Sequence, residues 1–333
     1  MRKPTYLSLG IAVGLLLLAK PAVGQSNPPQ EDERVIVGTH LVTVNVIVTD
    51  NNGRYVKGLT RDRFAVYDDT VKQEIAHFSA GSSPVSLGII CEIHETATER
   101  LEAMLAAIKQ FAGTLGNRDD FFFVAFSRHG SLTSAFIPSA QQVLDHLQYV
   151  KPGGPSSLYD AVYVAADRLQ KARNLKKALL VISDGQDSQS RYTYKELRDR
   201  LRAFDAQIYA IGIADSTIDQ FAGYGRWVFE DITRKTGRRS FLLNSEAALG
   251  RAVLAEMSRA SGGAAYFPET ESEPELAGIC TQIALELREQ YTLGFYSKVT
   301  GRKWHQLRVN VKERAGSSRP TLSYREGYQH SRN

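Results

Sequence analysis

The feature that most constrains the fold is the stretch at residues 86–96 (SLGIICEIHET), in which an apolar run stops abruptly at the carboxylate of Glu92. The run is short and its apolar residues do not alternate with polar ones, which predicts a strand buried on both faces. Glu92, His94 and Thr96 follow at the carboxyl end of this strand. Apolar residues then recur at helical spacing from Leu101 to Leu115, which predicts an amphipathic helix. In open α/β sheets, the loop between such a strand and helix binds ligands.

The first 24 residues have the composition of a signal peptide. Arg2 and Lys3 precede an apolar stretch from Tyr6 to Ala19, and the small residues that follow provide a cleavage site. The apolar stretch is shorter than the roughly 20 residues that span a bilayer, so we expect cleavage near Gln25 and no transmembrane segment afterwards. We therefore predict that the protein is secreted or periplasmic, as a component of the cell envelope.

Charge and cysteine content argue against two other classes of protein. Removal of residues 1–24 lowers the formal net charge from +5 to +2, because that segment holds three basic residues and no acidic one. The remaining basic residues form no stripe interleaved with aromatic residues, so we expect no nucleic-acid partner. Cys91 and Cys280 are too few for a disulfide scaffold. Export permits a bond between them, and two buried free thiols are an equally natural arrangement.

Further buried strands alternate with helical segments in the middle of the chain. Helical spacing from Leu158 to Leu169 and from Tyr194 to Phe204 predicts two helices. The strand candidates are residues 121–126, 178–182 and 208–213, with a shorter strand at 132–137 that pairs antiparallel at an edge. This alternation predicts the α/β class, with a doubly wound, mostly parallel sheet.

Both ends of the mature chain show β patterns. Residues 40–50 alternate apolar and polar side chains, which predicts a strand with one buried and one largely polar face. The other strand candidates are residues 55–59, 64–67, 73–78, 291–296, 305–311 and 322–324, the last three after a closing helix at 276–289. The C-terminal strands alone are too few for a stable domain. We therefore predict that they pair with the N-terminal strands into one smaller β-sandwich, in which the α/β domain is inserted.

Polar residues follow two predicted parallel strands and precede one helix. Glu92, His94 and Thr96 follow the first strand, Ser156 precedes a helix, and Asp184 follows a later strand. In a parallel sheet these positions lie at one edge, where hydroxyl and carboxylate oxygens suit a hard cation such as Mg²⁺. Two of these residues also have a simpler interpretation, Asp184 as a turn residue and Ser156 as a helix cap.

The order of these motifs resembles the von Willebrand factor type A domain. The matching segments are PVSLGII at 84–90, GGPSSLYDAV at 153–162, LLVISDGQD at 179–187 and IYAIGI at 208–213. Flanking segments, GLTRDRFAVYDD at 58–69 and LREQYTLGFY at 287–296, extend the resemblance to the acidobacterial branch of secreted proteins built on this domain. The resemblance implies a Rossmann-like fold and a role in protein binding or cell adhesion.

In that family, the metal site combines Asp-x-Ser-x-Ser in the first loop with a Thr in the second and an Asp in the third. Here Glu92, His94 and Thr96 occupy the first-loop positions, Ser156 replaces the Thr, and Asp184 is retained. Glutamate adds a methylene group, and imidazole is a poor ligand for Mg²⁺ and a good one for Zn²⁺. We therefore predict a degenerate metal-ion-dependent adhesion site that binds Mg²⁺ weakly or not at all. The sequence requires no cofactor, and a divalent cation, Mg²⁺ or Zn²⁺, is the only candidate.

These observations divide the chain and predict its function. The predicted parts are a signal peptide at 1–24, N-terminal β-strands at 25–83, a von Willebrand factor type A-like domain at 84–290 and C-terminal β-strands at 291–328. We predict an exported adhesion or protein-binding module that holds an unidentified protein partner at the edge formed by Glu92, Ser156 and Asp184. The alternative is a structural or assembly component of the envelope that contacts partners through the β-sandwich. We expect no enzyme acting through Glu92 and His94, because the chain has no GxSxG, HExxH or P-loop motif.

Overall fold

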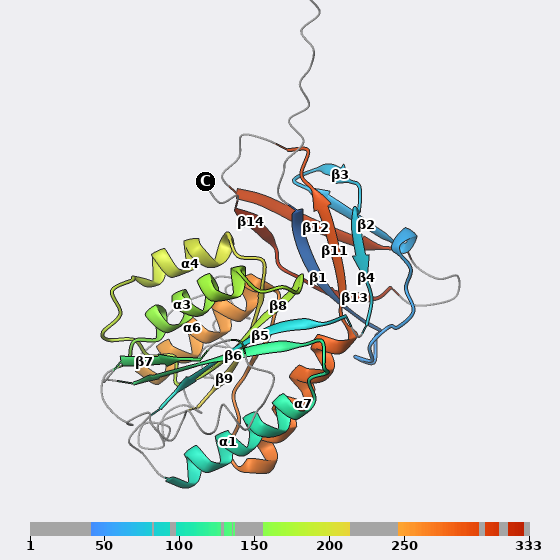
Figure 1. Ribbon diagram of the computed structural model, residues 1–333. Coiled ribbons are helices and arrows are strands. Elements are labelled where there is room, and N and C mark those ends of the chain that lie inside the picture. Colours follow the sequence, from blue (N-terminus) through green and yellow to red (C-terminus); the bar gives the residue numbers. More distant parts are fainter. Residues whose placement is uncertain are drawn as a thin grey trace, which may run out of the picture. The chain divides into compact units, whose positions relative to one another are not determined.

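The computed structural model describes residues 41–81, 83–93, 98–127, 130–134, 136, 156–213, 246–299, 304–312 and 319–329 (Figure 1). Within these residues, the chain forms one six-stranded sheet and two four-stranded sheets. The six-stranded sheet is formed by strands from the middle of the chain. Each four-stranded sheet combines strands from the N-terminal and the C-terminal parts of the chain. The predicted signal peptide at residues 1–24 lies outside the described residues.

A mostly parallel sheet is built from the middle of the chain. Its strands are β5 (Val85–Glu92), β6 (Asp120–Ser127), β7 (Gly130–Thr133), β8 (Lys176–Ser183), β9 (Gln207–Gly212) and β10 (Ala265–Tyr266). They lie in the order β10-β9-β8-β5-β6-β7, and only β7 is antiparallel to its neighbour. The doubly wound, mostly parallel sheet is confirmed, and β7 provides the antiparallel edge.

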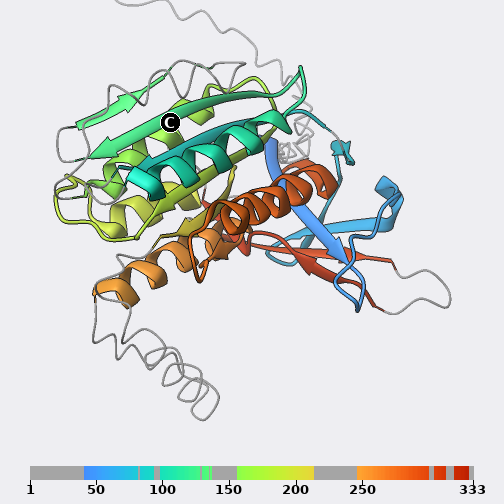
Figure 2. The same ribbon diagram turned by 90° about the horizontal axis from the view of Figure 1, so that it is seen from below.

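Helices cover both faces of this sheet (Figures 1 and 2). One face packs against α1 (Thr98–Gly113) and α7 (Glu273–Glu289), and the other against α3 (Leu158–Gln170), α4 (Tyr194–Arg202) and α6 (Glu246–Ser261). Strands β5, β6, β8 and β9 each contribute side chains to the cores on both faces, because successive side chains of a strand point to opposite faces. Among the described residues, no helix combines the length and the apolar character needed to cross a membrane.

Strand β5 is central to both cores. Every residue from Val85 to Glu92 is buried. Ile89 packs toward α1 and α7, whereas Ile90 packs toward α3. A Cβ atom at Gly88 would lie 2.6 Å from Cζ of Phe122, so a larger residue would push β6 away. The non-alternating apolar run is therefore explained by burial on both faces.

The two cysteines are free and buried. Cys91 lies on β5 and Cys280 on α7, within the same core. Burial raises the pKa of the Cys91 thiol well above its ordinary value, and the neighbouring Glu92 carboxylate acts in the same direction. Burial also raises the pKa of Cys280 to about 12. Of the two arrangements that the sequence leaves open, the structure contains the free thiols.

The remaining strands form a β-sandwich that combines both ends of the chain. They are β1 (Leu41–Thr49), β2 (Phe64–Asp68), β3 (Val71–Gln73), β4 (His77–Ser79), β11 (Tyr291–Tyr296), β12 (Trp304–Val311), β13 (Thr321–Ser323) and β14 (Gly327–Gln329). One sheet has the order β13-β1-β11-β4 and the other β14-β12-β2-β3. Val44 and Leu293 of the first sheet share a core with Val66 and Val309 of the second. The predicted sandwich of N- and C-terminal strands is confirmed.

Two predicted strands are wrong in detail. Residues 55–59 form no strand, because Gly58 adopts φ +72°, and Tyr55 makes only an isolated bridge with Thr49. Residues 73–78 are divided between β3 and β4, since the chain crosses there from one sheet to the other. A single turn of 3-10 helix, Arg61–Arg63, precedes β2.

Strand β1 differs from the predicted half-polar strand, because both of its faces are buried. Thr43 and Asn45 are only 6% and 7% exposed. Oγ1 of Thr292 on β11 donates a hydrogen bond of 2.8 Å to Oδ1 of Asn45. Nη2 of Arg325 donates to the carbonyl oxygen of Thr43 at 2.6 Å. Paired hydrogen bonds allow these polar groups to be buried, which alternation alone does not reveal.

Candidate functional site

The described part of the predicted site lies where β5 and β8 end and α3 begins. Glu92 is the last residue of β5, Asp184 follows β8, and Ser156 lies two residues before α3. Ser183 is the last residue of β8. We call these four residues the sheet edge. His94 and Thr96, the other two predicted site residues, lie outside the described residues.

Glu92 turns its carboxylate toward the end of β8. The residue is 3% exposed, and its Oε2 accepts a hydrogen bond of 2.6 Å from Oγ of Ser183. The same oxygen accepts from the backbone N–H of Asp184 at 3.3 Å. Oγ of Ser183 in turn accepts from the N–H of Gly185 at 2.9 Å. A buried carboxylate needs such donors, so Glu92 and the start of the loop after β8 fix each other in place.

The loop after β8 also caps α3. Oδ1 of Asp187 accepts a hydrogen bond of 3.1 Å from the N–H of Tyr159. Oγ of Ser190 accepts from the N–H of Asp160 at 3.0 Å and donates to Oδ1 of Asp187 at 2.6 Å. An acidic side chain is favoured at a helix N-terminus by the free N–H groups and the helix dipole. These bonds join the start of α3 and the loop after β8 into one unit.

Ser156 contributes a hydroxyl group to this unit. Its carbonyl oxygen accepts hydrogen bonds of 3.0 Å from the N–H groups of Ser188 and Gln189. The residue is 8% exposed, and among the described residues its Oγ has no hydrogen-bond partner. The interpretation of Ser156 as a cap of α3 is therefore wrong, because residues after β8 perform the capping. A buried polar atom without a partner calls for an explanation, such as a ligand.

Helix α6 packs directly against the loop after β8. Gly185 has φ +81°, and a Cβ atom there would lie 2.2 Å from the carbonyl oxygen of Gly250 in α6. Conversely, a Cβ atom at Gly250 would lie 2.2 Å from the carbonyl oxygen of Asp184. Two glycines thus permit a backbone contact that holds the loop against the helix.

The described residues of the sheet edge fit a metal ion only in part. Oγ of Ser156 and the carboxylate of Asp184 are suitable oxygen donors. Glu92 fits less well, because one of its oxygens already accepts two hydrogen bonds from the protein. The edge is therefore organised by hydrogen bonds within the protein, and the weak binding of Mg²⁺ stays a prediction.

Sequence reasoning missed two residues that position the site, Ser183 and Asp187. Both belong to the segment SDGQD at residues 183–187, and Ser and Asp are frequent turn and capping residues. The composition of the loop was thus a usable signal. The spacing of residues in the sequence does not specify which carboxylate or N–H group each of these residues contacts, because those groups belong to neighbouring strands and helices.

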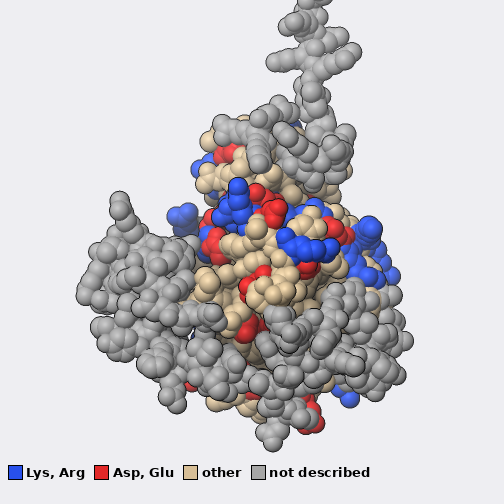
Figure 3. Space-filling model, turned by 90° about the vertical axis from the view of Figure 1, so that its left-hand side faces the viewer, with Lys and Arg blue, Asp and Glu red and all other residues tan. Residues whose placement is uncertain are grey.

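Charges of both signs are interspersed on the described surface at the left-hand side of Figure 1, as Figure 3 shows. Two acidic residues of α3 are paired with basic ones. Nε of Arg191 lies 3.1 Å from Oδ2 of Asp160, and Arg200 pairs with Asp167. The described part of this face therefore lacks the single-sign basic surface typical of nucleic-acid binding.

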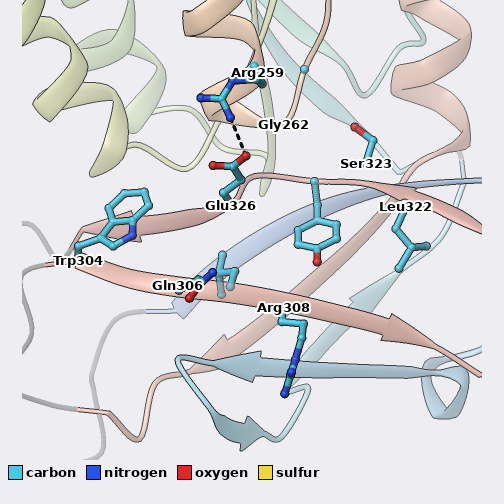
Figure 4. Close-up of a pocket in the computed structure, with 11 residues that line it drawn as sticks. Arg259, Gly262, Trp304, Gln306, Arg308, Leu322, Ser323 and Glu326 are labelled. Carbon is cyan, nitrogen blue, oxygen red and sulfur yellow. Dashed lines mark hydrogen bonds and ion pairs between the residues drawn. The ribbon is translucent and has the colours of Figure 1, made fainter. Parts of the chain in front are cut away.

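A hollow of about 610 Å³ lies between the end of α6 and strands β12 and β13 (Figure 4). Arg259 of α6 and Glu326 form an ion pair of 2.6 Å at this hollow. Trp304, which also lines it, is 38% exposed, and the guanidinium of Arg202 lies 4.9 Å from the centre of its ring. None of the lining residues belongs to the sheet edge.

Residues 95–225, less than half of the chain, match the model of the von Willebrand factor type A domain. The matched range includes Ser156 and Asp184 and begins after Glu92. The match confirms the resemblance at the level of this domain. Membership of the acidobacterial branch and degeneration of the metal site stay predictions. No curated protein matches the chain.

Several solved structures are similar to this chain at low sequence identity. The aerotolerance-related membrane protein of Bacteroides fragilis NCTC 9343 is 15% identical, with 61% of this chain and 98% of that chain covered and a TM-score of 0.42. BatB of Bacteroides thetaiotaomicron is 14% identical, with the same coverage and TM-score. The pilus adhesin SpaC of Lactobacillus rhamnosus GG is 10% identical, with 83% of this chain and 49% of that chain covered and a TM-score of 0.45. This chain thus spans about half the length of SpaC.

Proposed function

We propose that this chain is an exported protein-binding or adhesion module that holds a protein partner at the sheet edge. The observation that carries the proposal is the buried hydroxyl of Ser156, which has no partner among the described residues and lies in a unit fixed by hydrogen bonds. A type A domain in residues 95–225 supports a binding role rather than catalysis. Export rests on the predicted signal peptide at residues 1–24.

Binding at this edge does not require a metal ion. Glu92 anchors the loop after β8 through Ser183 and Asp184, so the loop is organised without a cation. A carboxylate and a hydroxyl at such an edge favour a partner that presents hydrogen-bond donors. The partner is therefore expected to stay bound when divalent cations are removed.

A second candidate function uses the β-sandwich as the contact surface of an envelope component. The observation that favours it is a set of exposed apolar side chains on this part of the chain. Val71 of β3 is 46% exposed and Tyr296 of β11 is 43% exposed. Single exposed apolar residues are common on protein surfaces, so this candidate stands second.

The test is capture of partners from a cell-envelope extract by the immobilised mature protein. Wild type is compared with Asp184→Ala at the sheet edge and Val71→Ala on the sandwich, each with and without EDTA. We expect one set of proteins with wild type and Val71→Ala under both conditions, and its loss with Asp184→Ala. Capture that persists with Asp184→Ala but is lost with Val71→Ala would favour the second candidate.

A further inference from the structure

We infer that the β-sandwich contains a divalent-metal site formed by Asp68, Asp69 and His305, with Zn²⁺ as the expected ion. We call these three residues the sandwich cluster. Asp68 ends β2, Asp69 follows it, and His305 lies on the neighbouring strand β12. The cluster shares no residue with the sheet edge, so this inference is independent of the proposed function.

The three ligand atoms already lie close to one another. Nδ1 of His305 lies 3.0 Å from Oδ1 of Asp68 and 3.7 Å from Oδ2 of Asp69. One ligand atom from each of the three residues lies within 4.8 Å of the other two. A tetrahedral Zn²⁺ with bonds of about 2.0–2.1 Å requires ligands roughly 3.3 Å apart. Small side-chain shifts would therefore place all three atoms around one ion, with a water molecule as the fourth ligand.

The other oxygen of each carboxylate is held by the protein. Oδ2 of Asp68 accepts hydrogen bonds from Oγ of Ser297 and from the hydroxyl of Tyr328, the latter at 2.7 Å. Oδ1 of Asp69 accepts from the N–H of Gln306 at 3.1 Å. Each carboxylate thus directs one oxygen toward His305, and such supporting hydrogen bonds orient the ligands of metal sites.

Burial and donor type indicate which ion fits. Asp68 and His305 are 0% exposed, and the side chain of Asp69 is 14% exposed, so the ion would reach the cluster from the side of Asp69. A divalent cation would balance two carboxylates in a place with little water. An imidazole nitrogen with two carboxylate oxygens suits Zn²⁺ better than Mg²⁺, which prefers oxygen ligands and retains several waters.

Binding at this cluster would stabilise the fold. The ligands come from the end of β2 and from β12, which are far apart in the chain, and Ser297, which follows β11 of the other sheet, donates a hydrogen bond to Asp68. The unfolded chain does not hold these residues together, so the ion binds the folded state preferentially. We therefore expect Zn²⁺ to raise the melting temperature of the mature protein.

The test is titration of the metal-stripped mature protein with Zn²⁺ and Mg²⁺ by calorimetry, together with the visible absorption spectrum after Co²⁺ addition. The key variant is Asp69→Asn. Asp69 has φ +55°, a conformation that asparagine also tolerates, and the amide oxygen can still accept from Gln306, so the fold should be kept. His305→Ala removes a second ligand, and circular dichroism checks its folding. Asp184→Asn at the sheet edge is the control.

We expect one Zn²⁺ per chain, binding at least about 100-fold weaker in Asp69→Asn, and unchanged binding in Asp184→Asn. The Co²⁺ spectrum should show coordinated metal in wild type and lose that signal in Asp69→Asn. Two results would overturn the inference. One is the absence of stoichiometric Zn²⁺ binding, which would leave the cluster as a structural hydrogen-bond network. The other is Zn²⁺ binding that survives Asp69→Asn and is lost in Asp184→Asn, which would place the ion at the sheet edge.

Discussion

The sheet edge and the sandwich cluster both place carboxylates at the ends of strands, but they use them differently. At the sheet edge, Glu92 is held by the last residue of the neighbouring strand β8 and by the residue that follows it. In the sandwich cluster, Asp68 meets His305, 237 positions away in the sequence. The first carboxylate organises a loop, whereas the second joins strands from the two ends of the chain. The structural role of each carboxylate therefore depends on the hydrogen-bond donors that it meets.

The largest expected effect is on the sandwich cluster. Asp68→Ala removes a fully buried carboxylate that pairs with His305 and accepts from Tyr328 and Ser297. We expect the free energy of unfolding to fall by about 3–5 kcal/mol, because buried donors and a buried imidazole lose their partner. Urea unfolding of the metal-free protein measures it, with Asp68→Asn as the milder control. A loss below about 1 kcal/mol would show that the cluster does not join the strands.

The second expected effect concerns Lys176 of β8, which connects the parallel sheet to the segment that follows β4 of the β-sandwich and to α7. Its Nζ donates to the carbonyl oxygens of Gly81 and Leu287, each at 3.0 Å. Burial, followed by the charge of Arg288, lowers the pKa of Lys176 to about 8. Between pH ~8 and ~10.4 the unfolded chain therefore binds more protons than the folded one, so this residue makes stability rise with pH, by up to about 3 kcal/mol.

Lys176→Met removes this titration. Urea unfolding at several pH values across that range should show wild type gaining stability relative to the variant as pH rises. If the free energy of unfolding of wild type and of Lys176→Met changed with pH in the same way, the lowered pKa of a buried Lys176 would be contradicted.

A smaller effect is expected at Glu92. Glu92→Ala leaves Oγ of Ser183 and the N–H of Asp184 without their acceptor, which should cost about 1–3 kcal/mol. Glu92→Gln keeps an acceptor oxygen and should cost less. Chemical denaturation measures both variants. Equal losses would mean that the negative charge, rather than the hydrogen bonds, holds the loop after β8.

The smallest effect on stability is expected at Ser156. Ser156→Ala should change the free energy of unfolding by less than about 0.5 kcal/mol, because the hydroxyl has no partner among the described residues. Ser183→Ala is the matched control and should cost about 1 kcal/mol, because its hydroxyl bonds Glu92 and Gly185. Partner capture should fall with Ser156→Ala despite its stability. A large loss of stability in Ser156→Ala would mean that the hydroxyl is structural.

The parallel sheet and its edge could be predicted because their signals are local. Apolar runs mark buried strands, and the residues after them meet at one edge of a parallel sheet, as Glu92 and Asp184 do. The sandwich was predictable as a pairing of chain ends, but its details were not. Gly58 ends a strand pattern through its backbone conformation, and Asn45 is buried through a bond to Thr292. The meeting of Asp68 with His305 depends on the register of β2 and β12, which neither segment specifies alone.

The most direct test of partner binding at the sheet edge is site-specific photo-crosslinking in the cell envelope. A photoreactive amino acid is placed at Gln189, an exposed residue of the loop after β8, or at Val71 on the sandwich. We expect a specific protein adduct from Gln189, with and without a chelator, and none from Val71. An adduct formed at Val71 and absent at Gln189 would contradict the assignment of the binding site to the sheet edge.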